Sequence, residues 1–314
     1  MASSSDHPRP RAARSPQDRA NLVGAAWMIA AMALFSVEDA FVKGATDTLP
    51  VGQVLILFGL GGALAFALKA RLSGERLVTR DVASRPMRIR VVFEIVGRLF
   101  YVLALALIPL SAATVILQAT PIVVVATAAL LFREKVGWRR WIAIATGMGG
   151  VLVILRPGTE GFSMLSILAV IGMLGFAGRD LASRAAPLSL GTAVLGFYGF
   201  LAIVAAGVIF SIWDGAGLVR PGLWAWAFVA GAVASGVLAY SCLMKAMRTG
   251  DVSAVTPFRY VRLLFGLALG VGLFGETIDF WTWIGSGMIL LSGLFVMWRT
   301  RPQKRMPPQP QGPA

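Results

Sequence analysis

The most informative charged residues of this sequence lie inside long apolar runs. Arg259 and Arg262 are three positions apart in the run TPFRYVRLLFG, a spacing that places both on one face of a helix. A guanidinium group can bind carboxylate or phosphate oxygens with two parallel hydrogen bonds. In a membrane, such a charge must face a partner, water or the interior of a helix bundle. These arginines therefore indicate either a site for a small anion or buried ion pairs.

Acidic residues that could balance the arginines lie in other apolar runs. The residues predicted for coupling or gating are Glu38, Asp39, Glu94, Arg179 and Asp180. Glu38 and Asp39 either form a solvated helix end or face a cavity, where a carboxylate could bind an ammonium group or carry a coupling proton. Glu94 and Arg98 share one helix face, either as a structural ion pair or as charges that line a cavity. Some of these acids are expected to balance the buried arginines.

Neutral polar and aromatic side chains complete the predicted site. Gln118 comes three residues before Pro121, and a proline inside a helix releases a carbonyl group and bends the helix axis. Such breaks are tolerated in membranes where neighbouring groups or a water-filled cavity satisfy the backbone. The residues predicted to bind the substrate are Arg98, Tyr101, Gln118, Tyr240, Arg259, Tyr260 and Arg262.

The elements that position these residues are predicted to be membrane-spanning helices. The chain of 314 residues is 57% apolar and only 14% charged, with a mean hydropathy of +0.75. Soluble domains are usually about a quarter charged, and a helix needs about 20 mostly apolar residues to cross a bilayer. The sequence therefore predicts an all-α integral membrane protein. The ten predicted spans are Leu22–Val42, Gln53–Leu68, Val91–Ile108, Ala112–Phe132, Trp141–Leu155, Phe162–Leu181, Leu190–Ile212, Leu223–Met247, Val252–Phe274 and Phe280–Trp298.

The distribution of charge predicts the orientation of these helices. The formal net charge of +14 comes from basic residues that gather in every second loop, such as the 69–90 and 133–140 loops, and in both tails. This is the positive-inside pattern of membrane proteins, so no nucleic acid partner is expected. Both termini are predicted to be cytoplasmic, with the lipid bilayer as the surrounding partner. The two tails, residues 1–20 and 301–314, have compositions typical of disorder.

The second half of the chain repeats the plan of the first half. A shift of 142 residues places Ser111 on Ser253 and Glu134 on Glu276. Five predicted spans separate the two copies, and because five is odd, the second copy enters the membrane from the opposite side. The sequence therefore predicts two inverted five-helix repeats, residues 21–157 and 158–300. In proteins with such repeats, the substrate site lies near the midplane between them.

Three elements of this pattern together resemble the EamA family of the drug/metabolite transporter superfamily. They are the ten spans, the inverted repeat and a Glu that closes the fourth span of each half, in FREK at 132–135 and in FGET at 274–277. The phrase TPFRYVRLLFG is also similar to the ninth span of bacterial members. The resemblance covers about residues 20–300. It implies secondary transport of a small organic solute across the bacterial inner membrane by alternating access.

The expected substrate is a small molecule such as an amino acid, a vitamin or a nucleoside-like compound. The excess of arginine suggests that it carries an anionic group. No ATP-binding G-x-x-x-x-G-K-[ST] string, no Cys/His metal cluster and no catalytic triad can be drawn from the sequence, so neither a cofactor nor a metal is predicted. A non-transporting sensor or scaffold is the alternative function, and an integral membrane enzyme is less favoured. Small-residue faces serve packing inside the bundle and would also allow a homodimer.

Overall fold

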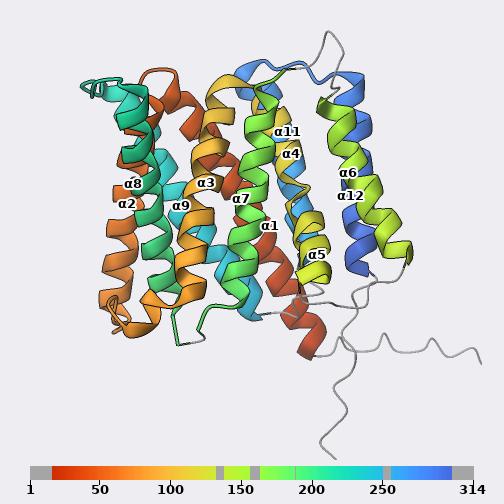
Figure 1. Cartoon of the computed structure of the whole chain (residues 1–314), viewed down its shortest axis with the longest axis horizontal. Coiled ribbons are helices and arrows are strands. Elements are labelled where there is room, and N and C mark those ends of the chain that lie inside the picture. Colours follow the sequence, from red (N-terminus) through yellow and green to blue (C-terminus); the bar gives the residue numbers. More distant parts are fainter. Residues whose placement is uncertain (1–15, 132–137, 156–162, 188, 250–255, 299–314) are drawn as a thin grey trace, which may run out of the picture.

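In the computed structural model the chain forms a bundle of helices (Figure 1). The structure describes residues 16–131, 138–155, 163–187, 189–249 and 256–298, and these ranges contain no strand. The all-α fold class is therefore confirmed for this part of the chain. The helices are α1 (Pro16–Thr46), α2 (Val51–Leu72), η1 (Arg80–Ala83), α3 (Arg85–Leu107), α4 (Leu110–Leu117), α5 (Thr120–Leu131), α6 (Trp138–Leu155), α7 (Ser166–Arg184), α8 (Thr192–Asp214), α9 (Leu223–Thr249), η2 (Thr256–Tyr260), α11 (Val261–Phe274) and α12 (Phe280–Trp298).

The first helix begins earlier than the composition of the N-terminal tail predicts. Residues 16–20, which the sequence assigns to the disordered tail, are the first residues of α1. Proline is well suited to the first turn of a helix, because its missing amide hydrogen has no partner there, and Pro16 occupies this place. The remaining tail residues, 1–15 and 301–314, lie outside the described residues, as does the turn that contains Glu134.

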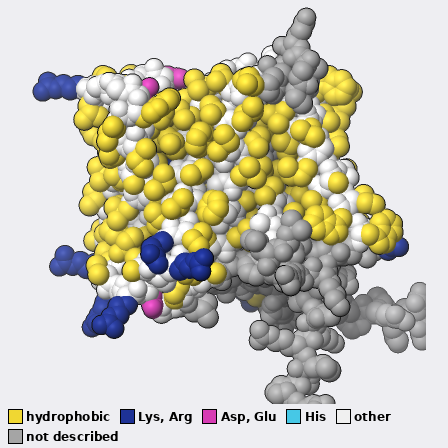
Figure 2. All heavy atoms as spheres, viewed as in Figure 1, with side chains coloured by type: hydrophobic (Ala, Val, Ile, Leu, Met, Phe, Trp, Pro, Cys, Tyr) yellow, Lys and Arg dark blue, Asp and Glu magenta, His cyan; other side chains and the backbone are white. Residues whose placement is uncertain are grey.

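The described helices present an apolar surface that suits a lipid environment. Five helical segments are long and apolar enough to cross a bilayer: Arg19–Thr46, Val51–Leu72, Ser166–Ser183, Thr192–Asp214 and Leu223–Ala246. Shorter apolar helices are Leu110–Val124, Trp141–Leu155 and Phe280–Ser292. Helix α3 is as long as these spans, but its four arginines and one glutamate lower its hydropathy. Figure 2 shows hydrophobic side chains over most of the visible face, with basic side chains mainly near its lower edge.

Helices from the two halves of the chain pack against each other in pairs. α1 packs along α9, α2 along α8, α3 along α7 and α6 along α12 (Figure 1). Glycines bring the paired backbones together: Gly175 of α7 lies against Gly97 of α3, and a methyl group added to Gly150 of α6 would lie 2.8 Å from the carbonyl oxygen of Gly285 in α12. Such small-residue contacts are a usual way for membrane helices to approach closely.

The fourth predicted span is interrupted, and the interruption contacts the 3-10 helix that precedes α11 in the ninth predicted span. α4 ends at Leu117 and α5 begins at Thr120, whose hydroxyl donates a hydrogen bond to the carbonyl of Leu117 at 2.5 Å. Pro121 follows and has no amide hydrogen to continue the helix. In the ninth span the 3-10 helix η2 precedes α11. The side-chain amide of Gln118 donates to the backbone carbonyl of Arg259 at 3.2 Å, so the predicted break is confirmed and is tied to the other half of the chain.

Large aromatic residues fill the core beside this junction. Phe58 and Phe66 of α2 and Tyr101 of α3 are among the largest fully buried side chains of the described residues. The ring of Phe200 in α8 lies 5.2 Å from that of Phe58 and 5.6 Å from that of Phe66, measured between centroids. Contacts of this kind add about 0.5–1.5 kcal/mol each beyond the burial of apolar area. The packed rings join α2 to α8, and the ring of Tyr101 packs edge-on against Phe176 of α7 beside the charged residues described next.

Candidate functional site

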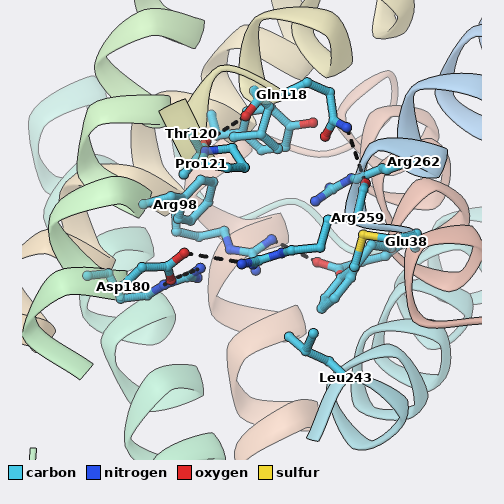
Figure 3. Close-up of a pocket in the computed structure, with 15 residues that line it drawn as sticks. Glu38, Arg98, Gln118, Thr120, Pro121, Asp180, Leu243, Arg259 and Arg262 are labelled. Carbon is cyan, nitrogen blue, oxygen red and sulfur yellow. Dashed lines mark hydrogen bonds and ion pairs between the residues drawn. The ribbon is translucent and has the colours of Figure 1, made fainter. Parts of the chain in front are cut away.

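A polar cavity lies among helices of both halves of the chain (Figure 3). Residues of α1, α3, the α4–α5 break, α7, α9, η2 and α11 line it. The volume within it that the centre of a water molecule can occupy is about 90 Å³. A single water requires roughly 10–15 Å³ of such volume. The cavity is therefore large enough for several waters. Its charged lining residues are Glu38, Arg98, Arg179, Asp180, Arg259 and Arg262.

Two adjacent carboxylates of α1 each bind a different arginine. Glu38 Oε1 accepts a hydrogen bond from Arg98 Nη1 at 2.7 Å, and Asp39 Oδ2 accepts one from Arg262 Nη2 at 2.5 Å. The Tyr101 hydroxyl also donates to Asp39 Oδ2, at 3.1 Å. Both acids are only 1% exposed, so the interpretation of a solvated helix end is wrong. Through these two pairs, α1 is connected to α3 and to α11.

Of the two alternatives for Glu94 and Arg98, an ion pair between them or charges that line a cavity, the ion pair is wrong, because each residue binds other partners. Glu94 Oε2 lies 3.6 Å from Arg90 Nη2, and Glu94 Oε1 accepts a hydrogen bond from Arg179 Nη1 at 3.3 Å. Arg98 binds Glu38 instead. The reason is the packing of the helices: α7 brings a guanidinium to Glu94, while α1 brings a carboxylate to Arg98. Spacing along one helix cannot show which neighbouring helix supplies the partner.

A second group of ion pairs connects α3, α7 and η2, and we call it the α7 network. Asp180 Oδ1 accepts hydrogen bonds from Arg179 Nη2 at 2.8 Å and from Arg179 Nε at 3.1 Å. Its other oxygen, Oδ2, lies 3.7 Å from Arg259 Nη2. Figure 3 shows Arg259 extending across the cavity toward Asp180. The members of the α7 network are Arg90, Glu94, Arg179, Asp180 and Arg259.

Aromatic rings lie beside three of the cavity guanidinium groups, and the Cζ atom of Arg179 lies 4.8 Å from the ring centroid of Phe176. The Cζ atom of Arg98 lies 5.4 Å from the ring centroid of Phe58 and 5.6 Å from that of Phe176. The Cζ atom of Arg262 lies 5.3 Å from the ring centroid of Phe35. A cation–π contact contributes about 0.5–1 kcal/mol at exposed sites and about 2 kcal/mol when desolvated. The rings therefore stabilise Arg98 and Arg262 in the positions where they meet the α1 carboxylates.

Most of the predicted site residues are found in the cavity. The predicted residues that line it are Glu38, Arg98, Tyr101, Gln118, Arg179, Asp180, Arg259 and Arg262. Asp39 and Glu94 are ion-pair partners of lining residues. Tyr240 and Tyr260 are not among the lining residues: the ring of Tyr240 packs edge-on against Phe66, with centroids 5.3 Å apart, and Tyr260 is 2% exposed within the hydrophobic core. Their positions within the predicted spans do not show in which direction the side chains point.

Some residues of the site cannot be identified by the same reasoning. Arg90 is assigned to the 69–90 loop from the sequence, but it lies in α3, is 4% exposed and donates a hydrogen bond from Nε to the hydroxyl of Ser183 at 3.0 Å. Its i,i+4 spacing to Glu94 is the signal that could have placed it on the helix. Phe35 and Phe176 line the cavity, but a phenylalanine in an apolar run carries no comparable signal.

The end of the bundle opposite the start of α1 is closed by contacts to the turn between α3 and α4. Lys43, near the end of α1, donates hydrogen bonds from Nζ to the backbone carbonyls of Leu105 and Ile108, both at 2.9 Å. These carbonyls belong to the C-terminal end of α3, where the helix dipole favours a positive charge. Lys43 therefore fastens α1 to the end of α3.

A carboxylate from the other half of the chain binds the same turn. Glu276, which follows α11, accepts hydrogen bonds from the backbone amides of Leu110 at 2.5 Å and Ser111 at 2.9 Å. These amides open α4, and the N-terminal end of a helix favours a negative charge. We call the contacts of Lys43 and Glu276 with residues 105–111 the distal clasp. It joins α1 and α11 to the α3–α4 turn.

The apolar helices and the charged cavity between them define a multi-pass membrane protein. The model of the EamA-like transporter family matches the chain twice, over residues 22–156 and over residues 163–298. The chain therefore belongs to this family, and the resemblance seen in the sequence is confirmed.

Similar proteins are transporters of several different metabolites. A riboflavin transporter of Vibrio cholerae is 26% identical over 288 residues, which cover 90% of this chain and 96% of that protein. An S-adenosylmethionine uptake transporter of Rickettsia prowazekii is 26% identical over 206 residues, which cover 64% of this chain and 68% of that protein. The pseudopaline exporter CntI of Pseudomonas aeruginosa is 27% identical over 273 residues, which cover 85% of this chain and 93% of that protein. A solved crystal structure shares the fold, with a TM-score of 0.61 and 20% identity over 90% of this chain and 99% of that one.

Proposed function

We propose that this chain is a secondary transporter that moves a small organic metabolite across the bacterial inner membrane by alternating access. The charged cavity carries the proposal, because it lies at the α4–α5 break and takes residues from both halves of the chain. Interrupted helices beside such a cavity are typical of the substrate sites of secondary transporters. The names of the relatives support an organic metabolite, such as an amino acid, a vitamin or a nucleoside-like compound.

The proposal includes ten membrane-spanning helices in two inverted repeats, residues 21–157 and 158–300, with both termini in the cytoplasm. The fourth span then consists of α4 and α5, and the ninth of η2 and α11. If the two halves are related by a two-fold axis, each span of one half corresponds to the span five places away in the other half. Spans one and eight then correspond to spans six and three, so the two pairs should pack in the same way. These are the α1–α9 and α7–α3 pairs, which both pack along their lengths. The match of the family model to each half also supports the repeat.

The positions of the cavity and the distal clasp support alternating access. Asp180 and Leu243 line the cavity near the C-terminal ends of α7 and α9, which the proposed topology places toward the cytoplasm. Lys43 and Glu276 lie near the C-terminal ends of α1 and α11, toward the outer side. We infer that this state is closed on the outer side. Opening toward that side requires the distal clasp to separate.

The ion pairs of the cavity are suited to gating between two such states. Glu38 and Asp39 are both paired and buried in this state. A buried carboxylate that loses its arginine is strongly destabilised, unless it gains a proton or another cation. Movement of α3 or α11 away from α1 would therefore require these carboxylates to exchange partners or to bind a coupling proton.

Transport can be tested before the substrate is known. Purified protein in proteoliposomes is incubated with a deproteinised cell extract, and mass spectrometry identifies the metabolites that the vesicles retain relative to protein-free liposomes. We expect one metabolite, or a few related ones, to accumulate. If none accumulates in either orientation of the protein, the proposal fails in favour of a sensor or scaffold. Conversion of an extract component into a new product would instead indicate an enzyme.

A further inference from the structure

We propose that the transported metabolite is an organic anion with one net negative charge, and that Arg259 binds its carboxylate or phosphate group. This inference rests on the proposed transport function and makes it more specific. It follows from the balance of charges around the cavity and from the different ways in which the arginines are held.

The first step is the charge of the ion-pair networks among the described residues. The two α1 pairs, Glu38 with Arg98 and Asp39 with Arg262, are each neutral. The α7 network has three guanidinium groups and two carboxylates. One positive charge of the described network is therefore not balanced by a carboxylate. A cavity with apolar walls and one unbalanced positive charge attracts a small anion.

The second step locates this charge on Arg259. Its contact with Asp180, at 3.7 Å, is the longest of the ion pairs described above, its side chain is 31% exposed, and it lines the cavity. Arg90 is held between Glu94 and Ser183, with a side chain only 5% exposed. Arg179 is held by Asp180, whose Oδ1 accepts hydrogen bonds from two of its nitrogen atoms. A guanidinium has five hydrogen-bond donors, so Arg259 keeps donors for another anion.

The third step excludes the other cavity arginines as the main anion site. Arg98 is bound to Glu38 at 2.7 Å and lies between two phenylalanine rings. Arg262 is bound to Asp39 at 2.5 Å and lies over a third ring. Their side chains are only 12% and 15% exposed. A substrate anion that displaced either carboxylate would leave a buried negative charge without a partner, which is strongly unfavourable.

The structure also explains how an anion could enter the network at Arg259. Asp180 binds Arg179 through Oδ1 and approaches Arg259 only through Oδ2. Arg259 can therefore move away from Asp180 without removing the partner of that carboxylate. The guanidinium can then present two parallel donors to a carboxylate or phosphate group, a geometry that arginine provides and lysine does not.

The test compares wild-type protein with Arg259→Gln, Arg259→Lys and Arg220→Gln in the proteoliposome assay with cell extract. Arg220 is a matched control, because it is an exposed arginine outside the cavity. We expect the accumulated metabolites to carry one net negative charge at neutral pH. Retention should fall about 10- to 100-fold in Arg259→Gln, the range expected when a charge-assisted hydrogen bond is lost. It should fall less in Arg259→Lys and remain unchanged in Arg220→Gln. Accurate mass and fragmentation then distinguish a carboxylate from a phosphate.

The outcomes separate this inference from the proposed function. Accumulation of neutral, zwitterionic or cationic metabolites would confirm transport and overturn the inference, and so would full retention of an anion by Arg259→Gln. The net charge of the accumulated metabolites is read from wild-type protein, so this part of the test does not depend on the folding of a variant. If wild-type protein accumulates nothing, the proposed function fails and the inference fails with it.

Discussion

Glu276→Gln should open the distal clasp while leaving the cavity intact. In the structure the carboxylate of Glu276 accepts hydrogen bonds from two backbone amides at the start of α4, at 2.5 and 2.9 Å. A hydrogen bond to a charged group contributes about 1.5–3 kcal/mol, and a neutral one about 1 kcal/mol. Glutamine keeps one acceptor oxygen, but it loses the charge and the favourable interaction with the helix dipole. We therefore expect the substitution to destabilise the state closed on the outer side by about 2 kcal/mol relative to the open state. The ratio of closed to open protein should then fall about 30-fold.

The opening can be measured as the reactivity of a single cysteine in the cavity. Cys242 is replaced by alanine, and Leu117, which lines the cavity at the end of α4, is replaced by cysteine. A membrane-impermeant methanethiosulfonate is then added to the outer side of intact cells. We expect slow labelling with the native clasp and labelling about 10- to 30-fold faster with Glu276→Gln, because the reagent enters only when the outer side is open. Asp214→Asn, an exposed acid at the end of α8, should not change the rate.

The same reagent added from the cytoplasmic side shows whether the introduced cysteine can react in both proteins. Both proteins should then be labelled at measurable rates in inside-out vesicles. If Glu276→Gln and the native protein are labelled equally fast from the outer side while cytoplasmic labelling proceeds, Glu276 does not hold the outer side closed. The assignment of the distal clasp would then be wrong.

Three further predictions concern the lysine of the distal clasp, the Glu38–Arg98 pair and the packing of α7 on α3. Lys43→Met should also speed labelling from the outer side, because it removes the two hydrogen bonds to the end of α3; an unchanged rate would contradict a role for this lysine in closure. Arg98→Gln should lower the stability of purified protein by about 3–5 kcal/mol because it leaves Glu38 buried without its cation. The double variant with Glu38→Gln should recover most of this loss in thermal unfolding, and failure to recover would show that the pair is not coupled. Gly175→Leu should prevent close packing of α7 on α3 and reduce the yield of monodisperse protein, whereas Gly287→Ala, where an added methyl group meets nothing within 4 Å, should be neutral.

Much of the fold could be predicted because lipid imposes simple rules on a sequence. Apolar length predicts where helices lie, and Pro121 predicts the break between α4 and α5. The arginines and acids within apolar runs stand out because lipid cannot solvate them, and six of the eight charged residues proposed from this reasoning line the cavity. The signal is strong at these positions because a charge in an apolar helix has few structural explanations.

The remaining features depend on the packing of helices, which sequence spacing does not contain. Glu94 and Arg98 have the spacing of an ion pair, but each binds a residue of a different helix. Tyr240 and Tyr260 lie well inside their predicted spans, where a substrate site is expected, but their side chains belong to the packed core. Phe176, by contrast, contacts the guanidinium of Arg98, although nothing in its local sequence distinguishes it from other core phenylalanines.

The central claim, secondary transport by alternating access, is tested most directly by counterflow. Proteoliposomes are loaded with a high concentration of the metabolite identified from the extract, diluted into buffer with a trace of its isotope-labelled form, and sampled over time. Alternating access predicts that the labelled form rises transiently above its equilibrium level inside the vesicles, because the unlabelled metabolite occupies returning carriers. Protein-free liposomes should show no such rise. Labelled metabolite that only approaches equilibrium, or that does not enter loaded vesicles at all, would contradict the account.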